Sequence, residues 1–269
     1  MKKLLVIFAI AGSIDITQAQ DTTHTQVLLS KKGIPILPEK GDWSIGIDAV
    51  PIINYIGNMF SNAGNSNSDY FNFGSSHPMT IVGKLMKTSD RAYRGKVRIG
   101  FGSLTQDTVV DDLSNPASHV TDETITSDFN LTLGAGLEWL RGKGRLRGLY
   151  GMEALITKGS HGITYSYGNE LTATNTGPRT TELKDGNKTG FGVRGFLGVE
   201  YFFAPKISLS GEFGWGIGFD YTGEGSSTVE EWDVTTSSVI ITTTKTGKTS
   251  AFLIDTDNAD AALILNFYF

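Results

Sequence analysis

The chain has 269 residues, with 28 Asp and Glu against 23 Lys and Arg, which gives a formal net charge of −5. Its 33 glycines exceed the usual share of about 7%, and 10% of its residues are aromatic. This composition favours a strand-rich fold over a helical one. The absence of cysteine excludes disulfides and thiolate metal sites. The sequence has no basic block of the kind that binds nucleic acid, so we expect no nucleic-acid partner.

Residues 1–19 have the order of a secretory signal peptide. A short basic start precedes an apolar run at 4–11, and small residues flank Gln18. The apolar run is far shorter than the roughly 20 residues that span a bilayer as a helix. We therefore expect export and cleavage after Ala19. Residues 20–40 are expected to form a periplasmic N-terminal lead, either free or tucked under the domain that follows.

Eight segments in residues 41–269 alternate apolar and polar side chains with the period of two that is typical of β-strands. The pattern is clearest at 128–139, where Phe129 and every second residue to Trp139 are apolar, whereas the residues between them are polar or glycine. Such strands have one apolar and one polar face. The predicted strands cover about 42–49, 79–87, 93–101, 128–139, 146–156, 191–201, 207–221 and 261–269.

The connections between the predicted strands alternate strictly between long and short. Long polar loops follow the first, third, fifth and seventh strands, at about 57–76, 106–124, 158–188 and 228–249. Outer-membrane barrels have short periplasmic turns, long extracellular loops and an even number of strands. Aromatic residues also gather near both strand ends, as they do in membrane girdles. The sequence thus predicts an all-β fold: an eight-stranded transmembrane antiparallel up-and-down β-barrel at 41–269.

The last long connection is unusually rich in threonine and β-branched residues. β-branched residues favour strands, so the flanking strands could continue as a protruding ribbon around 235–238. Such a ribbon would offer a sheet edge that captures a strand of another protein. The alternative is a stiff, threonine-rich surface loop.

The predicted inward faces carry charges of both signs. Isolated charges in a dry lumen would each cost several kcal/mol, so they must pair or hold water. An eight-stranded barrel has room only for its own side chains or one small ligand, and inward glycines leave space for long ones. We therefore expect a polar plug of paired charges. Counting residues from the short turns places all its members except Arg194 at similar heights in the barrel. Its expected members are Asp48, Lys84, Arg98, Glu153, Arg194 and Glu212.

Three histidines fall in or beside long loops, and each follows a serine: His77, His119 and His161. A hydrolytic site would need a hydroxyl activated by His, with the His oriented by a carboxylate. Nothing in the sequence fixes that geometry, so we expect no enzyme and no catalytic, cofactor or metal residues. The stretch 247–249 ends like a phosphate-binding loop but lacks the first glycine of that motif.

The final nine residues place Ala261, Leu263, Leu265, Phe267 and Phe269 on one strand face. This ending resembles the terminal strand of bacterial outer-membrane β-barrel proteins, in which it is the signal for the barrel-assembly machinery. Phe267 and Phe269 would carry that assembly signal here. With the leader, the eight strands and the alternating loops, the chain resembles small outer-membrane barrels of the OmpA, OmpX and OmpW type. Since Phe269 would close the barrel, we expect no periplasmic peptidoglycan-binding domain of the OmpA arrangement.

This resemblance implies an outer-membrane location, with membrane lipids and the assembly machinery as partners. It implies a structural or surface-interaction role, with a protein partner at the extracellular loops. Two alternatives stay open: a narrow channel for small solutes, and an outer-membrane lipid-modifying enzyme or protease that uses rim histidines. No functional residue is carried over, because the resemblance rests on patterning and fold does not determine function.

Overall fold

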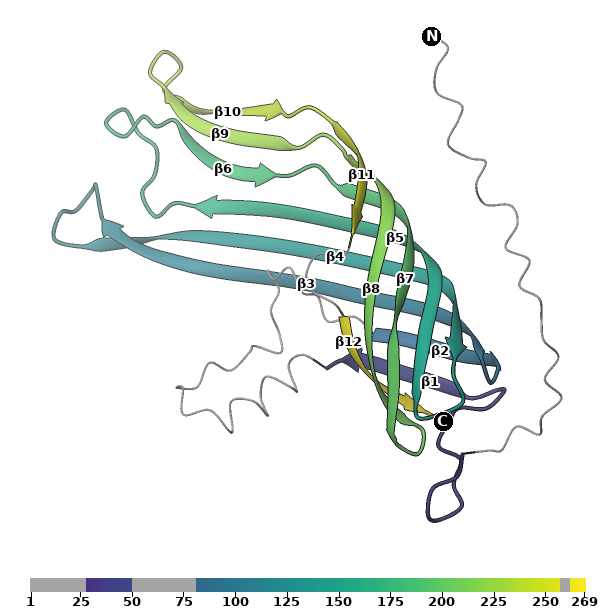
Figure 1. Cartoon of the computed structure of the whole chain (residues 1–269). Helices are drawn as coiled ribbons and strands as arrows, with labels where there is room; N and C mark the ends of the chain where they lie inside the picture. Colours follow the sequence, from purple (N-terminus) through teal and green to yellow (C-terminus); the bar gives the residue numbers. More distant parts are fainter. Residues whose placement is uncertain (1–27, 50–80, 257–261) are drawn as a thin grey trace, which may run out of the picture.

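The computed structural model describes residues 28–49, 81–256 and 262–269 (Figure 1). Its strands all belong to one twelve-stranded sheet with antiparallel pairing. No helix in these three ranges is long and apolar enough to cross a membrane. The prediction of an all-β fold is therefore confirmed.

The strands are β1 (Trp43–Asp48), β2 (Ile81–Thr88), β3 (Arg91–Asp111), β4 (His119–Arg141), β5 (Leu146–Ser166), β6 (Arg179–Lys184), β7 (Lys188–Ala204), β8 (Ile207–Thr222), β9 (Ser226–Asp233), β10 (Ser238–Lys245), β11 (Thr249–Thr256) and β12 (Ala262–Tyr268).

Eight of these strands close into a hydrogen-bonded ring in the order β1-β2-β3-β4-β5-β7-β8-β12. β12 pairs with β8 on one side and returns to β1 on the other, where Phe267 lies opposite Ile45. These eight strands correspond to the eight predicted from the sequence. β11 pairs with the same edge of β8 as β12, further along that strand, from Thr249 opposite Thr222 to Thr256 opposite Trp215.

Three ring strands are much longer than predicted. β3, β4 and β5 contain 21, 23 and 21 residues, and β3 pairs with β4 as far as Asp111 opposite His119. The loop predicted at 106–124 is therefore wrong, and so is the start of the loop predicted at 158–188. Both faces of these outer strand halves are mostly accessible, so they lack the apolar-polar contrast that marks a half-buried strand.

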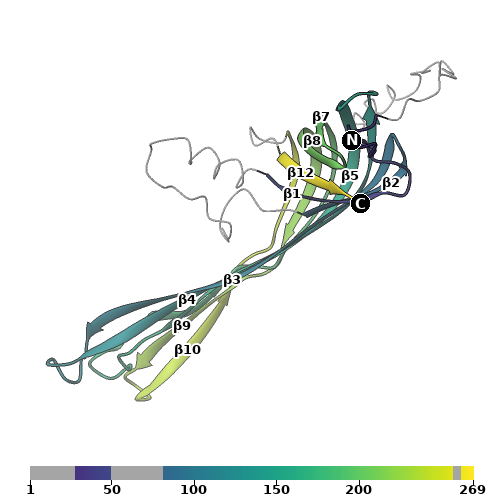
Figure 2. The same ribbon diagram turned by 90° about the horizontal axis from the view of Figure 1, so that it is seen from below.

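Beyond the ring, the long strands form an extended sheet with β6, β9 and β10, in the order β3-β4-β5-β6-β9-β10. We call this part, with the turns that join its strands, the distal sheet: residues 102–127, 160–184 and 226–245. Figure 2 shows it as a long slab that leads away from the ring. β9 and β10 form a hairpin around residues 234–237. Of the two alternatives for this connection, the ribbon is therefore confirmed, although β9 begins after a break at 223–225 and also pairs with β6.

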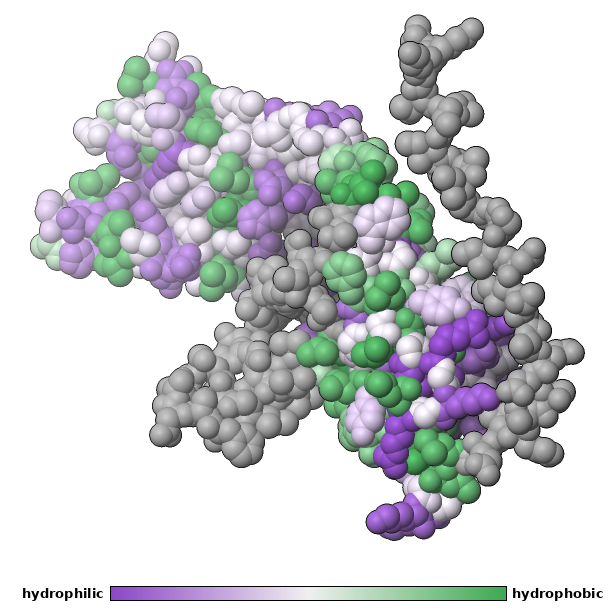
Figure 3. All heavy atoms as spheres, viewed as in Figure 1, coloured by the Kyte–Doolittle hydropathy of each residue, from purple (hydrophilic) through white to green (hydrophobic). Residues whose placement is uncertain are grey.

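The outer face of the ring is apolar and exposed. On β7, Phe191 and Leu197 are exposed, whereas the alternate residues Arg194 and Glu200 are buried. On the side seen in Figure 3, apolar side chains gather over the ring, and the distal sheet is mainly polar with scattered apolar residues. The predicted inward and outward faces therefore hold for most of the ring.

The short-turn end of the ring is closed by an apolar cluster that includes the segment before β1. Ile36 is 1% exposed in this cluster, and its carbonyl accepts a hydrogen bond of 3.0 Å from the Lys206 N–H in the turn between β7 and β8. The lead is thus tucked under the ring over its described residues. The predicted leader lies outside them. The other cluster residues are Met86, Ala92, Leu140, Leu149, Phe196, Phe202 and Tyr268, with Leu28 and Leu37 packed against them.

Candidate functional site

The ring interior holds a network of eight charged side chains, which we call the plug network. Strand alternation turns each of them inward from β2, β3, β4, β5, β7 or β8. Four are cationic and four are glutamates, so the network is formally neutral. Its members are Lys84, Arg94, Lys96, Glu138, Glu153, Arg194, Glu200 and Glu212.

Arg94 lies at the centre of the plug network. Its Nη1 and Nη2 donate to the two carboxylate oxygens of Glu212, at 2.7 and 2.8 Å, across the ring from β3 to β8. Nη1 also donates to Glu138 at 3.0 Å, and Nε lies 3.3 Å from Glu153. A bidentate arginine–carboxylate pair is among the strongest polar contacts in proteins and fixes both groups in a plane. Arg94 therefore joins three glutamates from three strands.

The remaining cations complete the plug network on both sides of Arg94. Glu153 accepts from Lys96 at 2.7 Å and from Arg194 at 2.9 Å, and Lys84 donates to Glu138 at 2.6 Å. Lys96 and Arg194 keep 17% and 11% of their side chains exposed, whereas the other six are at most 1% exposed. Solvent therefore reaches the network at Lys96 and Arg194.

Inward glycines leave room for the plug network, and an aromatic ring packs against it. A Cβ at Gly214 would collide with the guanidinium of Arg194, and a Cβ at Gly136 would collide with the β5 backbone at Met152. Phe196 faces inward, and its ring centroid lies 4.4 Å from the Arg94 guanidinium carbon. Inward glycines thus leave space for long charged side chains, as the sequence predicted.

Glu200 extends the plug network to the terminal strand. It accepts hydrogen bonds from Tyr268 Oη at 2.9 Å and Asn266 Nδ2 at 3.2 Å, both on β12, and from the Ser208 hydroxyl. Glu200, Asn266 and Ser208 are fully buried. A buried carboxylate with several donors holds their strands in one register, because each lost bond would leave a buried polar group unsatisfied. Side-chain hydrogen bonds inside the ring therefore hold β12 in its register.

The structure brings together four of the six residues predicted for the lumen charge cluster: Lys84, Glu153, Arg194 and Glu212. The predicted height of Arg98 is wrong. The tight β2–β3 hairpin pairs Lys84 with Arg94, and Arg98 lies opposite Thr132, further from the short turns.

Asp48 is also misplaced in that prediction, since Ser44 is the β1 residue in register with Lys84. The other network members missing from the prediction are Arg94, Lys96, Glu138 and Glu200. All four alternate with outward residues as the predicted members do, so the sequence indicates that they face inward but not the height at which each lies.

The predicted rim histidines do not converge. His77 lies outside the described residues, and His119 pairs with Asp111 at 3.1 Å at the far end of the distal sheet. His161 Nδ1 lies 2.8 Å from Asp128 Oδ1, its cross-strand neighbour. Ser160 cannot serve His161, because successive strand residues face opposite sides. Within the described part of the chain, the His161 ring bonds Asp128 alone, so it has an orienting carboxylate and no nucleophile.

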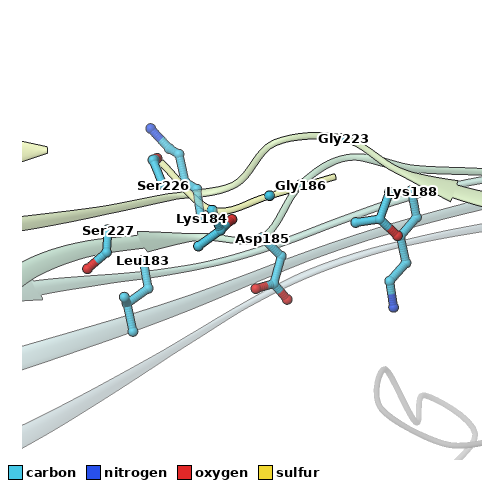
Figure 4. A pocket seen from close by; sticks show the side chains of 11 residues that line it. Leu183, Lys184, Asp185, Gly186, Lys188, Gly223, Ser226 and Ser227 are labelled. Atoms are coloured by element: carbon cyan, nitrogen blue, oxygen red, sulfur yellow. The ribbon is translucent and has the colours of Figure 1, made fainter. Parts of the chain in front are cut away.

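A pocket of about 280 Å³ lies where the distal sheet joins the ring (Figure 4). Its walls come from the connections β6–β7, β8–β9 and β10–β11, and a Cβ at Gly186 would collide with the backbone of Gly223. Asp185 and Lys188 point to one side of these connections and Lys184 to the other. The lining is thus polar and of mixed charge. No three potential metal ligands come together in the described ranges.

Comparison with known proteins adds no assignment: no protein-family model matches the chain, and no curated protein matches it. The fold and the geometry of the ring therefore carry the functional argument.

Proposed function

We propose that this chain is an integral outer-membrane β-barrel protein with a structural and surface-interaction role. Its ring spans the bilayer, and its distal sheet stands outside the membrane. The observation that carries this proposal is the band of exposed apolar side chains around a closed ring. On β3, β4 and β5 the band covers residues 93–101, 129–139 and 146–156. Each stretch has the length of a tilted transmembrane strand, roughly 9–11 residues.

The limits of the apolar band support the same proposal. Beyond Phe101 the outward positions of β3 become polar, beginning with Ser103, and on β5 Lys158 follows Ile156 in the same way. Aromatic pairs mark the short-turn end, where Trp139 stacks on Tyr150 with ring centroids 5.6 Å apart. Aromatic residues at both edges of an apolar band are typical of membrane-spanning barrels. A water-soluble protein rarely exposes so large an apolar surface.

The sealed interior favours a structural role over the channel alternative. The plug network is neutral and tightly paired, and the apolar cluster with Ile36 closes the ring beneath it. A charge pair of this kind is costly to break once it is buried, because each partner would lose its compensation. An ion would have to displace both layers to pass.

The distal sheet supports the surface role. β3 continues for ten residues beyond Phe101, and a strand rises roughly 3.4 Å per residue, so the sheet reaches roughly 30 Å past the apolar band. Elements that bind partners are commonly held away from a rigid scaffold in this way. Since His161 bonds no hydroxyl in the part of the chain that the structure describes, no observation there favours the enzyme alternative.

Fractionation of cells that express the full chain tests the proposal. We expect the protein in the outer membrane, cleaved to start at Gln20, with a gel mobility that changes on heating as the ring unfolds. Assembly would use the barrel-assembly machinery, which recognises the terminal strand with Phe267 and Phe269. Recovery in a soluble fraction, or a chain that retains Met1, would contradict it.

A further inference from the structure

The outer edge of β10 is free. β10 pairs with β9 through eight consecutive residue pairs, from Ser238 opposite Asp233 to Lys245 opposite Ser226. No strand of the described ranges pairs with its other edge, and all eight residues are exposed. An edge strand presents a row of unpaired N–H and C=O groups, which is a template for another strand.

The β10 edge also lacks the features that normally prevent pairing. Natural edge strands are blunted by proline, bulges, short length or charged side chains. Residues 226–245 contain no proline or glycine, and the β9–β10 register has no bulge. The one charge on β10 is Lys245, at its end. Its other residues are mostly β-branched and favour strand geometry: Val239, Ile240, Ile241, Thr242, Thr243 and Thr244.

Charge indicates which kind of strand would pair there. The distal sheet has ten carboxylates against three cations, Arg179, Lys184 and Lys245, a net charge of −7. The whole chain carries −5, so the distal sheet is more negative than the protein as a whole. A second copy would bring the same negative sheet and be repelled, whereas a cationic segment would be attracted.

The carboxylates nearest to β10 remain available to such a segment. Arg179 neutralises Glu230 on β9, with Nε 2.7 Å from Oε1. Glu231, which lies opposite Ile240, is exposed and forms no ion pair with a cation in the described ranges. The Thr235 N–H and the Thr236 hydroxyl donate to Asp233 and lower its pKa, which keeps the carboxylate ionised.

We propose that the free edge of β10 binds an extended, lysine- or arginine-bearing segment of another protein, which adds a strand to the distal sheet. Backbone hydrogen bonds supply the pairing, and the acidic sheet selects for positive charge. The inference deepens the proposed surface role and rests on it, because the edge must stand outside the membrane to meet a partner.

Binding of synthetic peptides to the full-length protein in detergent micelles tests this proposal. The probe is an eight-residue peptide in which valine and threonine alternate, except at three positions that hold lysine. Its binding is measured by fluorescence anisotropy. We expect binding that weakens as salt rises, and at least about tenfold weaker binding when glutamate replaces lysine. Thr242→Pro in the protein should weaken binding about tenfold by disrupting the edge. Ala173→Pro, in an exposed turn, is the control and should leave binding unchanged.

A second experiment changes only the peptide, so it tests the proposal even if Thr242→Pro misfolds the β9–β10 hairpin. A docked strand directs every second N–H to β10, so N-methylation of one alternate set of peptide residues should weaken binding and the other set should not. Equal binding of both methylated peptides, or no binding of the lysine peptide, overturns the proposal. Membrane location and the heat-dependent gel shift of the unaltered protein are measured in parallel. Their absence would count against the membrane proposal and not against the edge.

Discussion

Trp43 and Phe269 meet at the seam where the ring closes. Their rings stack with centroids 4.7 Å apart, and their backbones exchange two hydrogen bonds: Trp43 N to Phe269 O at 3.2 Å and Phe269 N to Trp43 O at 2.8 Å. The last residue of the chain thus completes the pairing between the final and first strands. Stacked aromatic pairs contribute roughly 0.5–1.5 kcal/mol beyond their buried area.

Deleting Phe269 should therefore reduce the yield of closed ring, because it removes both backbone bonds and the stacked ring. Unheated gels of membrane fractions, which separate closed from unfolded protein, measure the yield. Phe203→Ala is the matched control, since Phe203 is also exposed on the ring and lies away from the seam. Equal yields for the two variants would make the terminal aromatic incidental to closure.

Leu133→Arg should impair assembly far more than Asn130→Arg, three residues away on β4. Leu133 faces outward in the apolar band, where an arginine near the membrane midplane costs roughly 2–4 kcal/mol. Asn130 faces inward at a solvent-accessible position opposite Gly100 and Gly159, where space is open. The readout is the urea concentration at which each variant unfolds from vesicles. Similar midpoints would mean that the ring does not face lipid.

Arg94→Met should destabilise the ring strongly, whereas Arg98→Met should change little. Removing Arg94 leaves Glu212 and Glu138 with fewer partners at a site that is at most 1% exposed, and a broken buried pair costs roughly 3–5 kcal/mol. Arg98 is partly exposed and lies outside the plug network. Urea midpoints at matched protein-to-lipid ratio compare the two. A larger loss for Arg98→Met would restore the original height assignment.

The native protein should show little ionic conductance in a planar bilayer, because the plug network and the apolar cluster close the ring. Arg94→Met removes the centre of the plug network, so we expect either an added leak or the lower stability described above. A large and steady conductance of the native chain would instead promote the channel alternative.

Asp112, in the turn at 112–118, should titrate at low pH. Side-chain hydrogen bonds from Ser114 and Ser118, with the Ser114 N–H, lower the pKa of Asp112 from 3.8 to about 2. A depressed carboxyl pKa contributes stability above the unfolded value, and that contribution is lost as the pH falls through the folded value. Amide NMR shifts of Ser114 and Ser118 should therefore change with a midpoint near pH 2, well below the ordinary value of 3.8. The change should vanish in Asp112→Asn, and a midpoint at or above 3.8 would refute the assignment.

The sequence by itself determined the ring strands and most of their faces. On β4, alternation from Phe129 to Trp139 is enough to separate outward from inward residues, because a strand buries or exposes side chains by parity alone. The same local rule predicted the number of ring strands, whereas the β-branched residues near 235–238 left open either a ribbon or a stiff loop.

Only the tertiary structure decided how far the strands continue and which charges meet. β3 extends to Asp111 because β4 supplies backbone partners along its whole length, although neither face is consistently apolar there. Arg94, rather than Arg98, binds Glu212 because a tight hairpin sets the register and the closed ring brings β3 across from β8. Which face a residue occupies depends on its own strand alone. The height at which a side chain lies in the ring, and the side chain that it meets there, depend on all the strands that close the ring.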